Sequence, residues 1–84
     1  MVIVLEKLFV AQLYLCPADF QQKFRKVYQQ LKVVDNPSEI KGITQIEKNL
    51  YKLIVDKNKI ALRTDGDTVI IGCFLFNQFY RSPD

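Results

Sequence analysis

The chain has 84 residues, a formal net charge of +3 and no histidine. A chain of this length is expected to form one domain, residues 1–84, with a modest core. Its 49% content of hydrophobic residues excludes an intrinsically disordered chain. Without histidine, the usual general base near neutral pH is missing, and neither a zinc site nor any other metal or cofactor is expected.

The amino-terminal residues do not have the pattern of a targeting or membrane segment. Residues 1–5 are apolar, but Glu6 and Lys7 follow at once and no basic region precedes them. Cys16 and Cys73 are far apart and both lie within apolar patterns, so we expect buried free thiols. These features together predict a cytoplasmic protein that does not bind a membrane.

The first element is expected to be a short strand, because residues 2–4 are β-prone. From Leu5 the apolar residues recur at the i, i+3, i+4 spacing of a helix face, which predicts a helix over residues 5–15. Residues 9–15 also suit a buried strand, which is the alternative interpretation. The helix is the interpretation that we favour.

A second helix is expected to begin at Pro17, a residue that suits the first helical turn. The apolar residues that follow lie on one face and the polar residues on the other, up to Val34. Residues 35–38 have the composition of a turn. A polar connector over residues 39–48, with a bend at Gly42, leads into the last part of the chain.

Three β-rich runs separated by short turns then predict an antiparallel meander. Asp65-Gly66 indicates a tight turn, and Gly72 within the last run indicates a bulge or a close approach of another group. The last run is apolar on both faces and is expected to be an inner strand. The three runs are residues 51–55, 59–63 and 68–76.

Cations occur at alternate positions of the first two runs, which points to one basic face. Side chains alternate across a pleat, so Lys52, Lys59 and Arg63 are expected to point away from the core. Such a face can hold the phosphate of RNA and offset charge in the transition state when the 2′-hydroxyl of the substrate is the nucleophile. Tyr80 and Arg81 in the tail are further candidates for this chemistry. A solvated sheet face with a frayed tail is the alternative.

The polar face of the second helix carries a second group of cations. Lys23, Arg25 and Lys26 are candidates for contact with an RNA backbone, which would add affinity without sequence specificity. An ordinary solvated helix surface is the alternative interpretation of these residues.

The order of several short motifs resembles the RelE/ParE superfamily of toxins from toxin–antitoxin pairs. The resemblance covers nearly the whole chain and implies an α+β fold: a short strand, two helices and a three-stranded antiparallel meander (βααβββ). The motifs are PADFQQKF at 17–24, Leu31 followed by DNP at 35–37, IKGI at 40–43, YKL at 51–53 and KIAL at 59–62.

In the ribosome-dependent branch, the resemblance implies cleavage of messenger RNA in the ribosomal A site. Lys52 then falls on a catalytic lysine, Lys59 on an essential arginine, and Tyr80 on a tyrosine that stacks on or activates the substrate. The chain departs from the pattern at Ile54, where an active relative has a second catalytic lysine. Residues 77–78 replace a basic segment, for which Arg81 can substitute if the tail folds back.

Two functions follow as hypotheses. The first is a ribosome-dependent endoribonuclease toxin that a cognate antitoxin neutralises by covering the basic face. The second is a non-catalytic protein of the same fold, either a gyrase-directed toxin or an inactive homologue. The sequence leaves the oligomeric state open.

Overall fold

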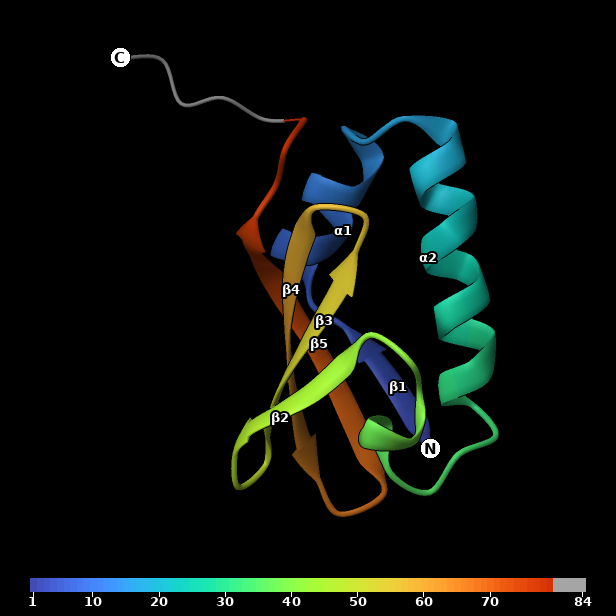
Figure 1. Ribbon diagram of the computed structural model, residues 1–84, viewed down its shortest axis with the longest axis vertical. Coiled ribbons are helices and arrows are strands. Elements are labelled where there is room, and N and C mark those ends of the chain that lie inside the picture. Colours follow the sequence, from blue (N-terminus) through green and yellow to red (C-terminus); the bar gives the residue numbers. More distant parts are fainter. Residues whose placement is uncertain (80–84) are drawn as a thin grey trace.

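The computed structural model describes residues 1–79 and shows a mixed α+β fold, with helices beside one sheet (Figure 1). Its elements follow one another as a strand, two helices, a short 3-10 helix and four further strands. They are β1 (Val2–Leu5), α1 (Lys7–Tyr14), α2 (Ala18–Leu31), η1 (Pro37–Glu39), β2 (Ile43–Glu47), β3 (Leu50–Val55), β4 (Asn58–Asp65) and β5 (Thr68–Phe76).

The strands form one five-stranded sheet in the order β1-β5-β4-β3-β2. Strands β2 to β5 are an antiparallel meander, and β1 pairs in parallel with β5 at the edge. The α+β class is therefore confirmed, and the last β-rich run is an inner strand between β1 and β4. The predicted βααβββ order has a three-stranded meander, whereas the observed meander has four strands. The additional strand is β2, which lies in the segment 39–48 that was expected to be a polar connector.

Strand β2 has little of the signal by which a strand is recognised in a sequence. Of its residues only Ile43 is buried, and the exposed positions that follow show no apolar alternation. Asn49 has a φ of +65°, which allows the tight turn from β2 into β3. Pairing with β3, rather than burial of its own side chains, therefore holds this strand in place.

Both expected helices are present, and each is shorter than predicted. Helix α1 begins at Lys7 because Leu5 is the last residue of β1, and the alternative strand over residues 9–15 is wrong. Helix α2 ends at Leu31, before the β-branched pair Val33-Val34. Beyond it, Asn36 caps η1 by accepting a hydrogen bond from the Ser38 backbone N–H at 2.9 Å.

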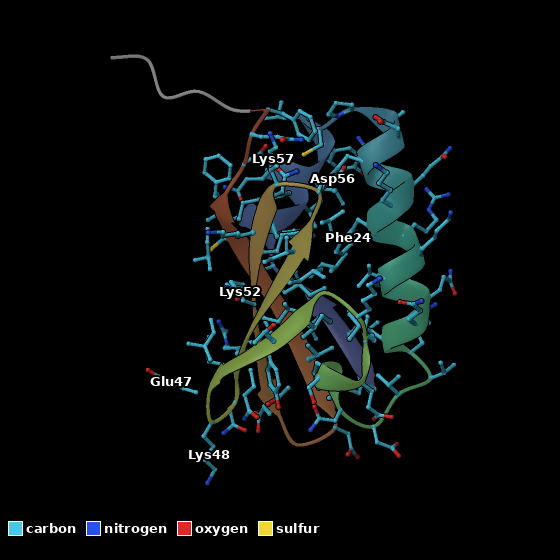
Figure 2. All side chains as sticks on the ribbon, in the orientation of Figure 1. Phe24, Glu47, Lys48, Lys52, Asp56 and Lys57 are labelled. Atoms are coloured by element: carbon cyan, nitrogen blue, oxygen red, sulfur yellow. The ribbon has the colours of Figure 1, made fainter. Side chains whose placement is uncertain are left out.

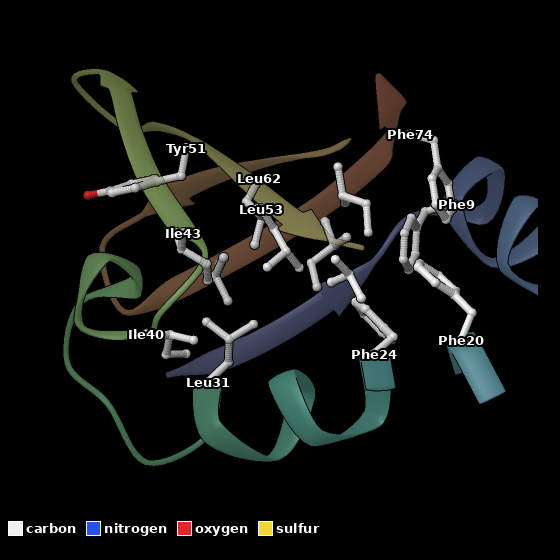
Figure 3. Close-up of a cluster of buried hydrophobic side chains, with 14 of the residues drawn as sticks. Phe9, Phe20, Phe24, Leu31, Ile40, Ile43, Tyr51, Leu53, Leu62 and Phe74 are labelled. Carbon is white, nitrogen blue, oxygen red and sulfur yellow. The ribbon is translucent and has the colours of Figure 1, made fainter. Parts of the chain in front are cut away.

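The core lies between α2 and the sheet, with α1 closing one end (Figure 3). The ring of Phe9 from α1 packs against Phe24 of α2 and Phe74 of β5, with centroid distances of 5.0 and 5.3 Å. At the other end, Leu31 and Ile40 lie close to the start of the meander (Figure 3). Burial of one face of β3 and β4 in this core turns their alternate residues to the opposite face.

The cysteines are free thiols in different surroundings. Cys16 is buried, as expected, whereas Cys73 is only partly buried, so the expectation for Cys73 is wrong. The reason is the strand register, which pairs Cys73 with Ala61 on the side of the sheet opposite the core. Within residues 1–79, no helix is both long enough and apolar enough to cross a membrane.

Candidate functional site

The side of the sheet that faces away from α2 is called the open face, and it carries the predicted sheet cations. In the register of β3 against β4, Lys52 pairs with Ala61, and Lys59 and Arg63 lie two residues to either side of Ala61 on the same strand. Because side chains alternate, all of these residues share one face. Figure 2 shows Lys52 on this side of the sheet, whereas Phe24 points from α2 into the core.

The spacing of the cations follows from the same register. Lys52 is a diagonal neighbour of both Lys59 and Arg63, a relation that places Cα atoms about 7–8 Å apart. Lys59 and Arg63 are four residues apart along β4, which is about 13 Å. The long arms of Lys52 and Lys59 can therefore converge on one phosphate, while Arg63 lies at the far side of Lys52.

A shallow groove of about 280 Å³ lies on the open face next to Arg63. Its walls come from α1 and from three neighbouring strands, and most of them are apolar. The apolar residues that line it are Leu8, Leu50, Ala61, Leu62, Ile70 and Cys73. The open face therefore has an apolar groove beside the basic residues Lys52 and Lys59.

Arg63 is held by an ion pair that the sequence did not reveal. Its Nη1 lies 3.0 Å from Oε1 of Glu6, at the junction of β1 and α1. Lys52 and Lys59 make no ion pair with any other residue in the 1–79 range. Two of the three predicted cations are thus available to an anionic ligand, and the charge of the third is offset.

The helix cations form a separate surface. Lys23 is bonded to Asp56 in the β3–β4 turn, with Nζ–Oδ distances of 3.1 and 3.0 Å. Arg25 and Lys26 are exposed on α2, which covers the face of the sheet opposite the open face. The structure therefore does not bring Lys23, Arg25 or Lys26 together with Lys52 and Lys59.

Tyr80 and Arg81 lie outside the described residues, but the segment before them is well anchored. The backbone N–H of Gln78 donates to Oδ1 of Asn58 at 2.9 Å, and the Phe79 ring packs edge-on against Phe20 at 5.6 Å. Asn58 is adjacent to Lys59, which itself pairs with Phe76. Asn58 points to the core side of β4 and Phe20 belongs to α2, so residues 78–79 lie on the helix side of the sheet and not on the open face.

Asn58 is the anchor of this segment and is fully buried. Its Nδ2 also donates to the carbonyl of Val55 at 3.2 Å. One side chain thus makes a hydrogen bond to the residue before the β3–β4 turn and another to the backbone N–H of Gln78. Such a residue looks like an ordinary turn asparagine in a sequence. Sequence reasoning missed it because its partner is distant along the chain.

We expect Asn58→Leu to lower the free energy of unfolding by about 1–3 kcal/mol, because it removes the hydrogen bond to the Val55 carbonyl and leaves the backbone N–H of Gln78 without its partner. Denaturant unfolding measures this loss, and hydrogen exchange measures the freed amide of Gln78. An exchange rate at Gln78 equal to that of the unsubstituted chain would show that the anchor does not hold the segment.

The buried thiol of Cys16 has no place in the candidate chemistry. Burial raises the pKa of Cys16 above its usual value, and the hydrogen bond from Asn77 opposes this shift only in part. The thiol therefore stays protonated near neutral pH and is a poor nucleophile. Within the described part of the chain, histidine, cysteine and carboxylate side chains form no cluster of three that could hold a metal ion.

Comparison with known proteins defines the fold. No protein-family model matches the sequence, and no curated protein does. Among solved structures, the chain is similar to one chain of the RelB–RelE antitoxin–toxin complex from Methanococcus jannaschii, with a TM-score of 0.74. The two chains are 22% identical, and the match covers 86% of this chain and 87% of the other. The chain thus has the fold of a component of that complex.

Proposed function

We propose that this chain is the toxin of a toxin–antitoxin pair and acts as a ribosome-dependent endoribonuclease on messenger RNA. The observation that carries the proposal is the placement of Lys52 and Lys59 as diagonal neighbours on the open face. The similarity of the fold to a chain of an antitoxin–toxin complex supports the same function.

The chemistry that this face supports needs no histidine. The 2′-hydroxyl of the RNA attacks the neighbouring phosphorus, the new O2′–P bond forms and the P–O5′ bond breaks. The 2′-hydroxyl loses its proton and the 5′-oxygen gains one, which leaves a 2′,3′-cyclic phosphate and a 5′-hydroxyl end. Lys52 and Lys59 stabilise the extra negative charge on the phosphate oxygens as the phosphorus becomes five-coordinate.

The same face suits an antitoxin with an acidic, amphipathic segment. Carboxylates of such a segment would pair with Lys52 and Lys59, and its apolar side chains would fill the groove beside Arg63. An antitoxin bound in this way blocks access of RNA to the same two lysines. Neutralisation and activity then depend on one surface.

A non-catalytic protein of the same fold is the second candidate, and two observations favour it. Ile54 pairs directly with Lys59, so the position beside that lysine is apolar. Arg63 is bound to Glu6, which reduces the positive charge on the open face. A gyrase-directed toxin or an inactive homologue would use this face for protein contact only.

Mapping of messenger RNA ends after induction separates the two candidates. We expect new 5′-hydroxyl ends within translated regions, and their loss when initiation is blocked, because the reaction takes place on the ribosome. Growth arrest without new RNA ends, together with relaxed plasmid DNA, would instead identify a gyrase-directed protein. Neither arrest nor cleavage would identify an inactive homologue.

A further inference from the structure

The ion pair between Glu6 and Arg63 crosses the open face of β5. Arg63 projects from β4, which neighbours β5 on one side, and Glu6 follows β1, which neighbours β5 on the other. The two side chains meet with Nη1 and Oε1 3.0 Å apart. The guanidinium of Arg63 therefore lies across β5, toward the β1 side of the sheet.

The backbone around β5 is arranged so that these side chains can meet. The N–H of Glu6 donates to the carbonyl of Ile71 at 3.0 Å, which fixes the junction of β1 and α1 against β5. The next residue, Gly72, lies at a register shift between β4 and β5. A Cβ at Gly72 would lie only 3.3 Å from Oε1 of Glu6. The absence of a side chain at Gly72 therefore leaves room on β5 for the carboxylate of Glu6 to meet Arg63.

The charge of Arg63 is consequently offset within the molecule. Both partners stay partly exposed, with 57% of the Arg63 side chain and 40% of the Glu6 side chain accessible. Ion pairs this exposed are weak and are screened by salt. A phosphate that approaches Arg63 must therefore compete with the carboxylate of Glu6 for the guanidinium.

We propose that Glu6 is a specificity-determining residue of the open face, because it occupies Arg63 as an internal anion. This inference rests on one part of the proposed function, namely the binding of a polyanion by the open face. A ligand with one anionic group binds Lys52 and Lys59 and leaves the pair intact. A strand with several phosphates also reaches Arg63, but Glu6 keeps the guanidinium from pairing with a further phosphate, so Glu6 disfavours extended polyanions relative to small anions.

The test is the binding of a labelled single-stranded DNA oligonucleotide to Glu6→Gln at several salt concentrations. Glutamine retains the size of the side chain and removes its charge. If Arg63 is freed to contact one more phosphate, the slope of log affinity against log salt becomes steeper by about 0.7. Asp19→Asn, at the start of α2 on the opposite side of the sheet, raises the net charge equally and is expected to leave the slope unchanged.

Substitution of the partner completes the test. We expect Arg63→Gln to weaken binding, because Glu6 is then left as an uncompensated negative charge on the face. The double variant Glu6→Gln/Arg63→Gln is expected to return to the slope of the unsubstituted protein. Thermal unfolding of each variant verifies that the fold is retained.

Two outcomes would overturn the inference: a slope for Glu6→Gln equal to that of Asp19→Asn, or no binding of the oligonucleotide by any variant. Because DNA lacks the 2′-hydroxyl, the experiment does not depend on RNA cleavage. A protein that shows the expected slopes but cuts no RNA would refute the nuclease function and retain the role of Glu6.

Discussion

Replacing Lys52 and Lys59 together by alanine is expected to abolish the growth arrest caused by expression of this chain. Loss of a single group that stabilises transition-state charge commonly costs about 10²–10³ in rate. The two lysines are diagonal neighbours and act on the same phosphate, so their joint loss is expected to exceed that of either alone. Cell growth after induction and the yield of cleaved messenger RNA are the two measurements.

The matched control is the double variant Lys41→Ala/Lys48→Ala. Both of these lysines are exposed, and their removal lowers the net charge by the same amount as the removal of Lys52 and Lys59. Lys48 lies in the turn between β2 and β3 and points away from the sheet (Figure 2). Full toxicity is expected to persist in this control. Equal toxicity in a folded Lys52→Ala/Lys59→Ala protein would rule out the open face as the site.

The second large effect is expected for Phe9→Ala. Phe9 is fully buried and its ring contacts Phe24 and Phe74, so it joins α1, α2 and β5 in one cluster. Truncation of a buried phenylalanine costs about 3–5 kcal/mol. Small domains have about 5–15 kcal/mol of total stability, so much of it would be lost. Denaturant unfolding followed by circular dichroism measures the change.

Leu8→Ala is the control for Phe9→Ala, since it removes an apolar side chain one residue earlier on the same helix. Leu8 is 59% exposed, and its truncation is expected to change the free energy of unfolding by less than about 0.5 kcal/mol. Similar losses for the two variants would show that α1 is not anchored through Phe9.

The elements that could be predicted from the sequence are those whose own side chains are buried on one face. Residues 51–55 and 59–63 alternate between apolar and polar side chains, and both are strands with the expected faces. The amphipathic pattern after Pro17 likewise marks α2. Strand β2 was missed because it is held by pairing with β3 and has little apolar alternation of its own.

The site was predictable only in part, because a sequence shows the alternation within one strand but not the contacts between distant strands. The shared face of Lys52, Lys59 and Arg63 follows from local alternation within two strands joined by a short turn. The pair between Glu6 and Arg63 depends on how β1 and β4 both align with β5, which alternation within a strand does not reveal. Asn58 similarly depends on the backbone of Gln78, which is distant along the chain.

The parallel pairing of β1 with β5 also has a consequence for synthesis of the chain. Val2 of β1 lies opposite Thr68 of β5, so the first strand to leave the ribosome has no partner until nearly all of the domain has followed. Pairings between segments this distant are slow to form, and unpaired strands are prone to aggregation. The nascent chain therefore stays incompletely folded until translation of this domain is almost finished, and the contact of Glu6 with Arg63 is among the last to form.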